Sequence, residues 1–384
     1  MSSKKFPHII QFIKSLYPDE NPVSLHAPRF LGNEKKYLTD CIDSTYVSYI
    51  GKYVNRFEEM VSEYTGADYA VAMVNGTCAL HIALKLCGVM PGDEVLTQAL
   101  TFVATANSIC YCGAQPVFFD SDRSSLGMSI DKLEAFLQGQ TFLKDDGNCY
   151  NKKSGKHIAA CVPMHVFGHT VQIDKIKTLC DEYHIALIED AAESLGSCYK
   201  NKHAGTFGSV GILSFNGNKP VTTGGGGMII SDDEFIVKRA KHITTTAKVP
   251  HRWEYIHDEV GYNYRMPNIN AALGCAQMEL FPQFLESKRQ LAATYRDFFQ
   301  KIDVNFISEP KDCRSNYWLN TIVLKDRIER DAFLEHAHSN GVACRPLWCL
   351  MSNLTMYKHC QTDDLMNAKW LEDRVVNIPS SVRV

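Results

Sequence analysis

Lys219 lies in the stretch ILSFNGNKPVTTGGGGMIIS, residues 212–231, between the end of an apolar segment and four consecutive glycines. A solvated surface ammonium is strongly hydrated and needs no such setting. The pattern therefore indicates a lysine that acts as a chemical reagent, and the groups that the fold brings to it decide which reaction it serves.

Three other polar sites follow apolar segments that predict strands. In open α/β sheets, ligands bind beyond the carboxyl ends of the strands. The strand predicted over residues 69–74 runs into NGTCAL, so Gly76 and Thr77 lie where a helix begins and where free backbone N–H groups suit a phosphate. Asp190 ends IALIED and Ser214 lies in VGILSF. Taken singly, the helix start and Asp190 have a structural explanation as caps.

Together, a lysine, a carboxylate and a phosphate-sized helix start are the parts that hold pyridoxal phosphate. Lys219 would form the Schiff base, Asp190 would keep the pyridine nitrogen protonated, and helix-start amides and hydroxyls would take the phosphate. The glycines are explained if a flat cofactor and a bulky substrate approach the main chain. Nucleotide binding has less support, because the chain contains neither G-x-x-x-x-G-K-[ST] nor G-x-G-x-x-G.

The elements that must position these residues alternate between strand-like and helix-like segments from about residue 57 to 230. This rhythm predicts βαβ units and a mostly parallel sheet with helices on both faces. We expect strands at 69–74, 93–98, 115–122, 157–165, 185–190, 210–215 and 226–231, and helices at 78–89, 103–113, 129–138 and 173–184. The polar stretch 143–157 predicts an exposed loop.

The length of 384 residues predicts two domains, a large one and a smaller one. Residues 268–303 predict long amphipathic helices, and residues 317–348 predict a strand, a helix and a strand. We expect an N-terminal docking helix and arm over 1–24, a large cofactor-binding domain over 25–250, and interdomain helices with a small C-terminal α/β domain over 251–384.

Composition and charge exclude several classes of protein. Hydrophobic residues make up 45% and the formal charge is −3, so no basic field indicates nucleic acid or an anionic membrane. No apolar run is long enough to cross a bilayer. The N-terminal residues Phe6, Ile9, Ile10, Ile13 and Leu16 recur at helical spacing, which predicts an amphipathic docking helix rather than a signal peptide. We expect a cytoplasmic protein.

Metal ligation and disulfides have little support. The fourteen cysteines are scattered through apolar segments without any C-x-x-C, which predicts buried free thiols. His165 and His169 have i,i+4 spacing in HVFGH, but the glycine and the neighbouring Pro-Met argue against a helix there. We expect no metal site.

Seven segments in order resemble the DegT-type nucleotide-sugar aminotransferases, which have the aspartate aminotransferase fold, fold type I. They cover about residues 25–350, and they read NGTCALHIAL, GDEVLTQALTFVATANSICYCGAQPVFFD, HVFGH, IEDAAESLGS, GSVGILSFNGNK, GGGGMI and GYNYRMPNINAALGCAQ. The resemblance implies a pyridoxal phosphate enzyme with a large, mostly parallel sheet domain and a smaller C-terminal α/β domain.

The resemblance also implies roles for single residues. Lys219 would be both the covalent anchor of the cofactor and its proton carrier, and Asp190 would pair with the pyridine nitrogen. A sugar 3-dehydratase branch of the family has histidine in place of this lysine, so Lys219 favours transamination. The cofactor phosphate would contact Gly76, Thr77 and Ser214.

Two further residues of the resemblance concern the ring and the subunit interface. Phe102, in TFVAT, occupies the position whose aromatic ring stacks on the pyridine. Asn263, in GYNYRM, matches an asparagine that reaches the phosphate of the neighbouring subunit's cofactor. The resemblance therefore implies a homodimer with shared active sites.

Glu193 departs from the family, whose members usually have glutamine or histidine there, facing the phenolic oxygen of the cofactor. An ionised glutamate cannot donate the hydrogen bond that those residues donate. Either Glu193 holds a proton, or its charge favours the protonated cofactor–lysine linkage. In the alternative, Glu193 turns aside to a backbone amide or to water.

The substrate implied by the resemblance is a nucleotide-linked keto sugar. The chain is most similar to the bacillosamine and legionaminic acid branch of the family. Enzymes of this branch transfer the amino group of L-glutamate to the 4-keto carbon of UDP-2-acetamido-2,6-dideoxy-4-hexulose, and the glutamate becomes 2-oxoglutarate. The product, UDP-4-amino-4,6-dideoxy-N-acetylglucosamine, would serve surface glycan synthesis. Ser352 and Thr355 stand where many family members have histidine and proline, and Pro220 removes a backbone donor after the lysine. A GDP- or dTDP-linked keto sugar, and a non-catalytic cofactor-binding regulator, stay open as alternatives.

Overall fold

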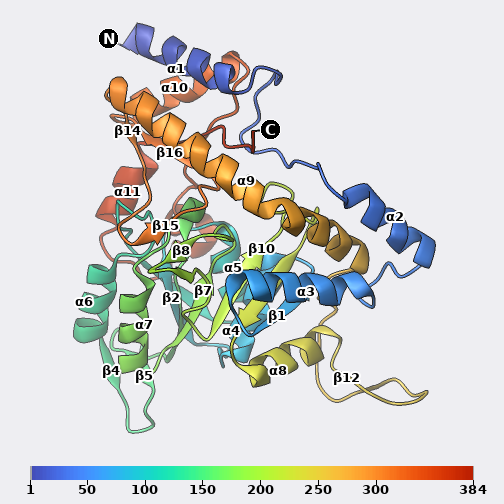
Figure 1. The fold of residues 1–384 in the computed structure, drawn as a ribbon. Coiled ribbons are helices and arrows are strands. Elements are labelled where there is room, and N and C mark those ends of the chain that lie inside the picture. The colour runs from blue at the N-terminus through green and yellow to red at the C-terminus, as the bar shows by residue number, and fades with distance from the viewer. Residues whose placement is uncertain (1, 384) are drawn as a thin grey trace.

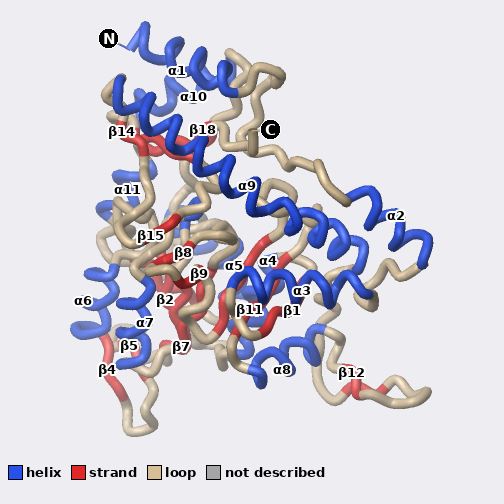
Figure 2. The backbone as a smooth tube through the Cα atoms, viewed as in Figure 1, coloured by secondary structure: helices blue, strands red, loops and turns tan. Residues whose placement is uncertain are grey.

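The computed structural model describes residues 2–383, and Figures 1 and 2 show their arrangement. Within these residues a central sheet has seven strands, in the order β1-β11-β10-β7-β6-β2-β3. The strand β11 pairs antiparallel with β1 and β10, and the other neighbours pair in parallel. The strands are β1 (Tyr69–Met73), β2 (Glu94–Gln98), β3 (Gln115–Phe119), β6 (Ile158–Val162), β7 (Ala186–Asp190), β10 (Val210–Ser214) and β11 (Gly227–Ser231).

Alternation along the strands divides the core into two layers. In β1, Ala70 and Ala72 pack in one hydrophobic cluster, whereas Val71 and Met73 pack in the other. Successive side chains of a strand point to opposite faces, so a continuous apolar strand must be covered on both sides. Helices do so here, and the predicted mostly parallel α/β sheet is confirmed.

The helices of the large domain lie on both faces of the sheet. One face packs against α3, α9, α6 and α7, and the other packs against α4, α5 and α8. Helices α2 and α3 precede the first strand and had no counterpart in the sequence prediction. The bounds are α2 (Glu34–Ser44), α3 (Lys52–Thr65), α4 (Gly76–Leu86), α5 (Val103–Tyr111), α6 (Ile130–Gln140), α7 (Ile173–Glu182) and α8 (Glu234–Thr244).

The helix α9 (Asn268–Lys301) is a single helix of 34 residues that runs diagonally across the molecule (Figure 1). It packs against α2 and α3 at one end and against β14 (Asn305–Phe306) at the other. The sequence predicted several helices here, but Pro282 lies inside the helix without ending it. Among residues 2–383, no helix combines the length and the apolar composition that a membrane span requires.

A smaller sheet carries the C-terminal part, with α1 docked on it. Four strands among the described residues follow the order β14-β16-β18-β17, and all of them pair antiparallel. Helix α1 (Ser2–Leu16) lies in the segment expected to form a docking helix, and it buries Phe6, Ile9, Ile10 and Ile13 in the same cluster as α10. The other elements are β16 (Asn320–Val323), α10 (Arg327–Ser339), β17 (Arg345–Pro346), α11 (Met366–Glu372) and β18 (Val375–Ile378).

The stretch predicted as a loop, 143–157, is partly a β-hairpin, so that prediction was wrong. Strand β4 (Thr141–Leu143) pairs with β5 (Cys149–Asn151). Asp146 accepts a hydrogen bond from the Asn148 amide at 2.9 Å, and Gly147 has a φ of +80° that suits glycine. This Asp-Gly signal identifies the turn, although the strands are too short for a periodic pattern.

Short elements complete the chain. A small sheet joins β8 and β9 to β15, and a hairpin of β12 and β13 projects from the large domain (Figure 1). The bounds are β8 (Cys198–Tyr199), β9 (Lys202–His203), β12 (Lys248–Val249), β13 (Ile256–His257) and β15 (Cys313–Arg314), with 3-10 turns η1 (Val166–Gly168), η2 (Met351–Asn353) and η3 (Thr355–Tyr357).

Candidate active site

A cavity of about 310 Å³ lies at the carboxyl ends of β7 and β10, where α4 and α5 begin. This is the place where an open α/β sheet binds ligands. Seven of the eight residues predicted for the site line the cavity: Gly76, Thr77, Phe102, Asp190, Glu193, Ser214 and Lys219. We refer to it below as the lysine cavity.

The ammonium of Lys219 is held between a carboxylate and an indole. Its Nζ atom donates a hydrogen bond to Oε1 of Glu193 at 3.0 Å and lies 3.6 Å from the ring centroid of Trp318. Lys219 is only 9% exposed. A buried ammonium requires such partners, since desolvation without them is costly. The backbone before it forms a turn in which the Lys219 amide donates to the Asn216 carbonyl.

Glu193 is fixed at both carboxylate oxygens. One oxygen takes the bond from Lys219, and the other accepts a hydrogen bond from the Phe167 backbone amide at 2.9 Å. Burial raises the pKa of Glu193 to about 7, while the charge of Lys219 opposes that rise. The side chain therefore contacts a backbone amide, as the alternative interpretation had it, and also faces into the cavity beside Lys219.

Asp190 presents its carboxylate to the same cavity from the end of β7. Thr105 donates a hydrogen bond to Oδ2 at 2.7 Å, and the Ala192 amide donates to Oδ1 at 3.2 Å. Burial raises the pKa of Asp190, and the Thr105 bond counteracts that effect. A cationic group in the cavity would therefore find a carboxylate already oriented toward it.

The neighbouring Glu189 points to the other side of β7, as strand alternation requires. Its oxygens accept hydrogen bonds from the amides of Gly205, Phe207 and Gly208, and His165 Nε2 lies 3.0 Å away. Burial opposes ionisation, but these bonds outweigh it and lower the pKa of Glu189. Glu189 therefore holds the 205–208 turn, and Asp190 alone of this pair serves the cavity.

The start of α4 supplies backbone donors. The Asn75 side chain caps the helix by accepting a bond from the Cys78 amide at 2.8 Å. The amides of Gly76 and Thr77 lie in the first turn, where no intrahelical acceptor exists. A Cβ on Gly76 would lie 3.3 Å from the Ser214 Cβ, so these two residues meet at one end of the cavity.

Two of the four glycines after Lys219, Gly226 and Gly227, are required by the protein's own packing, so a close-lying cofactor is not needed to explain these two. A Cβ on Gly227 would lie 2.5 Å from the Asn75 backbone, and a Cβ on Gly226 would lie 2.2 Å from Thr223 Oγ1. Gly224 has a φ of +79°, which disfavours other residues. Of the four, only Gly226 lines the lysine cavity within residues 2–383.

Asn263 is the predicted site residue that the structure leaves outside this cavity. It is exposed and forms an isolated β-bridge with Thr245. The expectation concerned a neighbouring subunit, so its role stays a prediction. Ser352 in η2 is half-buried, Thr355 in η3 is exposed, and neither lines the lysine cavity.

Two tryptophans and a threonine of the site had no place in the sequence prediction. Trp318 precedes β16, lies over Lys219 and donates its indole N–H to the Asn218 carbonyl at 2.7 Å. Trp348 follows β17, and its ring centroid lies 6.0 Å from that of Phe102. Only the fold brings these C-terminal aromatics to the sheet edge. Thr105 could have been identified as a site residue from the sequence TFVAT, because its hydroxyl lies about one helical turn after Phe102, the residue predicted to stack on the cofactor ring.

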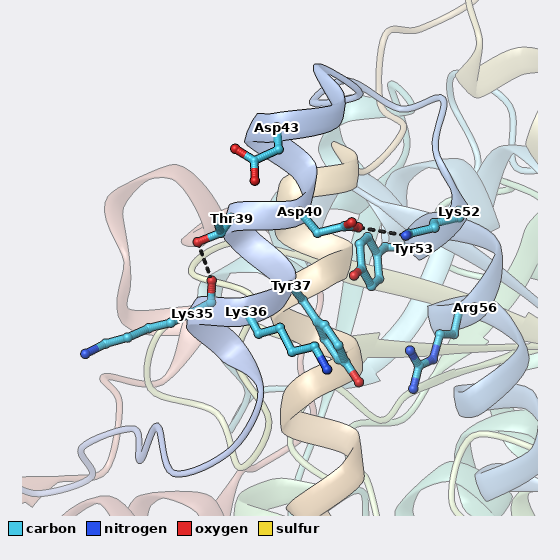
Figure 3. A pocket seen from close by; sticks show the side chains of 9 residues that line it. All are labelled: Lys35, Lys36, Tyr37, Thr39, Asp40, Asp43, Lys52, Tyr53 and Arg56. Atoms are coloured by element: carbon cyan, nitrogen blue, oxygen red, sulfur yellow. Dashed lines mark hydrogen bonds and ion pairs between the residues drawn. The ribbon is translucent and has the colours of Figure 1, made fainter.

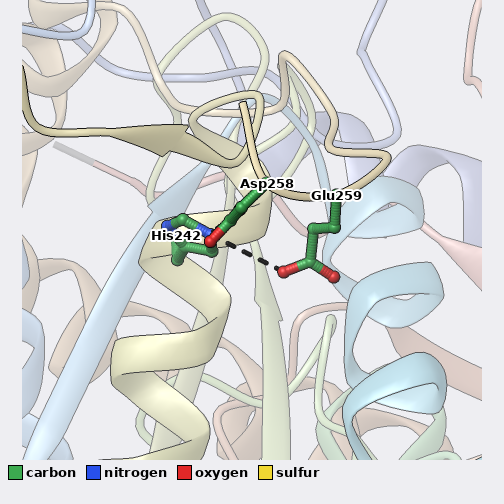
Figure 4. Close-up of side chains that lie close together, drawn as sticks. All are labelled: His242, Asp258 and Glu259. Carbon is green, nitrogen blue, oxygen red and sulfur yellow. Dashed lines mark hydrogen bonds and ion pairs between the residues drawn. The ribbon is translucent and has the colours of Figure 1, made fainter. Parts of the chain in front are cut away.

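Other clusters of ligand-type residues do not form a comparable centre. His165 pairs with Glu189, and both ring nitrogens of the buried His169 lack a hydrogen-bond partner within residues 2–383. His242 lies 2.7 Å from Asp258 and 3.6 Å from Glu259 (Figure 4). Arg239 already binds both oxygens of Glu259, so this group is an exposed network of ion pairs.

An open groove between α2 and α3 is a further concave feature with charged walls (Figure 3). Its volume is about 870 Å³, and its lining carries lysines, an arginine and aspartates. Lys52 pairs with Asp40 at 2.8 Å, and Arg56 pairs with Glu279 at 2.7 Å. Two of the cations in the groove are thus paired within the chain, and its lining residues do not resemble a catalytic set.

The residues of the lysine cavity fit pyridoxal phosphate. The amine of Lys219 can hold the aldehyde, the oriented Asp190 carboxylate can hold the pyridinium, and the first amides of α4 with the hydroxyls of Thr77 and Ser214 can hold a phosphate. The aromatic ring of Phe102 at the wall offers a face for the pyridine.

Comparison with known proteins gives the same chemistry. The DegT/DnrJ/EryC1/StrS aminotransferase family matches residues 30–384. GDP-perosamine synthase of Escherichia coli O157:H7 is 35% identical over 363 residues, 93% of each chain. EpsN of Bacillus subtilis (strain 168), named as a pyridoxal phosphate-dependent aminotransferase, is 38% identical over 85% of this chain and 81% of its own.

A solved structure agrees. The DegT DnrJ EryC1 StrS aminotransferase from Brucella abortus superposes with a TM-score of 0.82 at 25% identity, over 91% of this chain and 90% of its own. Fold type I, the enzyme class and the cofactor are confirmed, whereas the narrower UDP-sugar branch stays a prediction. The chain belongs to the DegT/DnrJ/EryC1/StrS aminotransferase family and is a pyridoxal phosphate-dependent nucleotide-sugar aminotransferase.

Proposed function

We propose that the protein transfers the amino group of L-glutamate to the 4-keto carbon of a nucleotide-linked 6-deoxy sugar. The observation that carries the proposal is the buried ammonium of Lys219, 3.0 Å from Glu193 in a cavity that Asp190 also lines. A non-catalytic regulator gives no reason to keep a lysine and two carboxylates together in one enclosed space.

Each predicted residue has a part in this proposal. When bound, the cofactor supplies an aldehyde and an electron-withdrawing ring. Lys219 would hold the cofactor through its amine and would carry the proton that leaves the donor α-carbon. Asp190 would hold a proton on the pyridine nitrogen, and Phe102 would offer its face to the ring. Gly76, Thr77 and Ser214 would hold the phosphate.

Glu193 is the residue by which this chain departs from its family. Its carboxylate at 3.0 Å stabilises positive charge on the Lys219 nitrogen. Burial brings the pKa of Glu193 to about 7, so its carboxylate can gain or lose a proton near neutral pH beside the Lys219 nitrogen. We propose that Glu193 sets the protonation of the nitrogen that joins lysine and cofactor.

We further propose that two subunits share their active sites. Asn263 would reach the cofactor phosphate of the neighbour. Two projecting segments carry exposed apolar side chains suited to a subunit contact: Tyr46, Val47, Tyr49 and Ile50 between α2 and α3, and Trp253, Tyr255, Ile256 and Val260 around the β12–β13 hairpin. Figure 1 shows α2 and this hairpin at the same edge of the view.

For the substrate we propose UDP-2-acetamido-2,6-dideoxy-4-hexulose first. The support is the resemblance in the segments around Phe102 and Lys219 and in the terminal VVNIPSS. A GDP-linked keto sugar is the second candidate, because GDP-perosamine synthase is similar over 93% of the chain. Ser352 and Thr355, at positions where family members differ, weaken the first choice.

A panel of UDP-, GDP- and dTDP-linked 4-keto sugars tests this proposal. The holoenzyme, glutamate and each sugar are incubated together, and the amino sugar and 2-oxoglutarate are quantified by mass spectrometry. We expect the highest kcat/KM with the UDP sugar. A clear preference for the GDP sugar would replace the first substrate by the second, and no amino sugar from any member would refute the proposed reaction.

A further inference from the structure

A second cavity, of about 460 Å³, adjoins the lysine cavity. The two share three lining residues, Asn218, Trp318 and Trp348. Asn218 directly precedes Lys219, and Trp318 lies 3.6 Å from its ammonium. A molecule bound near Lys219 can therefore extend one end into the second cavity.

The second cavity has a positive lining. Arg345 lies in its wall, and no acidic side chain lines it among the described residues. Arg345 is solvent-exposed at the cavity, and within residues 2–383 its guanidinium has no ion pair and no side-chain hydrogen bond. Asn377, which lies opposite Arg345 in the β17–β18 register, also lines the cavity. An unpaired guanidinium in a concave, acid-free space is a receptor for a planar oxyanion.

A buried donor lies in the same wall. His26 lines the cavity, and its Nε2 atom is 2.9 Å from the ammonium of Lys288, which also donates to the carbonyls of Trp318 and Ser380. Where Lys288 is protonated and Nε2 accepts from it, a neutral His26 carries its hydrogen on Nδ1. Nδ1 has no partner among residues 2–383. Burial, then the nearby Lys288, lowers the pKa of His26, which keeps the ring neutral.

We propose that the second cavity is the subsite that binds a carboxylate of the amino donor, with Arg345 as the residue that recognises it. The inference rests on the proposed function, since it places the donor's reacting amine at Lys219. The donor class is an α-amino acid with a second carboxylate. Arg345 touches substrate here, and His26, whose Nε2 atom lies 2.9 Å from Nζ of Lys288, forms part of the wall.

The diphosphate of a nucleotide sugar has the same anionic chemistry and is the rival occupant. The observations favour the carboxylate. The wall offers one guanidinium, which matches one carboxylate in a two-pronged contact, and the rest is largely aromatic or aliphatic: Leu25, Phe167, Trp318, Leu319, Pro346 and Trp348. A diphosphate would leave further oxygens without charged partners against this apolar lining.

The test separates the two half-reactions of the holoenzyme for Arg345→Gln and Arg345→Lys. The first half is followed by the absorbance change of the cofactor on adding glutamate, and the second by its return on adding keto sugar. We expect Arg345→Gln to raise the half-saturating glutamate concentration about tenfold or more, with the limiting rate and the sugar half-reaction little changed. Arg345→Lys should recover part of the loss, and Arg296→Gln, at an exposed site on α9, should change nothing.

A binding measurement on cofactor-free protein keeps the inference distinct from the proposed function. Trp318 and Trp348, two of the four tryptophans, line the cavity, so the tryptophan fluorescence of the protein is titrated with 2-oxoglutarate and, separately, with inorganic pyrophosphate. We expect 2-oxoglutarate to bind and Arg345→Gln to weaken it about tenfold or more. If Arg345→Gln lost pyrophosphate binding or the sugar half-reaction and kept 2-oxoglutarate binding, the inference would be overturned. It would also be overturned if Arg345→Gln left the half-saturating glutamate concentration unchanged. A holoenzyme inert toward every donor would refute the proposed function, and this titration would still decide whether Arg345 binds a carboxylate.

Discussion

Glu193 and Lys219 form a buried ion pair, with 3.0 Å between Oε1 and Nζ, at the centre of the lysine cavity. The carboxylate comes from the loop after β7, and the lysine comes from the loop after β10, so two adjacent parallel strands bring them together. Burial raises the pKa of Glu193 to about 7, which makes the charge of this pair sensitive to pH in the physiological range.

Replacing Glu193 by glutamine should lower the apparent pKa of the chromophore that Lys219 forms with the cofactor. The negative charge at 3.0 Å favours the protonated nitrogen, so its removal lets that nitrogen lose its proton at lower pH. The measurement is the absorbance of the holoenzyme between pH 5 and 10. Glu286→Gln, an exposed change on α9, serves as the control, and an unmoved titration curve in Glu193→Gln would return Glu193 to a structural role.

Asp190→Asn should lower kcat on the order of 100-fold or more while the protein still binds cofactor. A neutral amide cannot hold a proton on the pyridine nitrogen, so the ring withdraws electrons less strongly. Steady-state turnover and the cofactor stoichiometry are measured together, with Asp181→Asn on α7 as a surface control. Near-normal turnover would mean that Asp190 serves only Thr105 and the Ala192 amide.

Lys288 should make the stability of the protein depend on pH above neutrality. Burial lowers its pKa to about 7, whereas an unfolded chain holds a lysine pKa near its usual value. Between these two pKa values the unfolded chain holds a proton on Lys288 that the folded protein does not. The free energy of unfolding therefore rises as pH rises from 7 toward the unfolded pKa, and it falls again as pH returns toward 7. The difference in unfolding free energy between wild type and Lys288→Met should therefore move in favour of wild type from pH 7 to pH 9.5. Urea denaturation measures the free energy of unfolding at each pH. The control variant Lys311→Met, at an exposed site, should show no such change. If wild type and Lys288→Met differ by the same unfolding free energy at both pH values, the lowered pKa of Lys288 is contradicted.

Mixing two inactive variants should restore activity if the subunits share their sites. In a mixed dimer of Lys219→Ala with an inactive Asn263 variant, one site keeps both residues, because each would come from a different chain. The measurement is turnover after exchange under conditions in which subunits dissociate, against each variant alone. A fully active monomer at high dilution would rule out the shared site.

The sequence predicted the local part of this molecule well. Strands ending in Asp190 and Ser214, the helix start at Gly76 and the docking helix with Ile9 and Ile13 were visible because periodicity and strand ends are properties of short segments. The same segments determine most of the cofactor cavity. The Asp-Gly turn of the β4–β5 hairpin is also visible in the sequence, at Asp146 and Gly147.

The rest depends on contacts between distant segments. Trp318 meets Lys219, and His26 meets Lys288 across 262 positions of the chain, and no local pattern announces such pairs. The reason for the glycines was likewise hidden, because Gly227 is required by the Asn75 backbone on another element. The second cavity, formed by the N-terminal arm, the lysine loop and the C-terminal strands, exists only in the folded chain.

Trapping the cofactor with borohydride tests the central claim most directly, since it identifies the lysine that holds pyridoxal phosphate. The holoenzyme is reduced and digested, and the phosphopyridoxyl group is located by peptide mass spectrometry. The account predicts the label on Lys219 in the wild type and none at this position in Lys219→Ala. A label on another lysine, such as the buried Lys288, with Lys219 unmodified would contradict it.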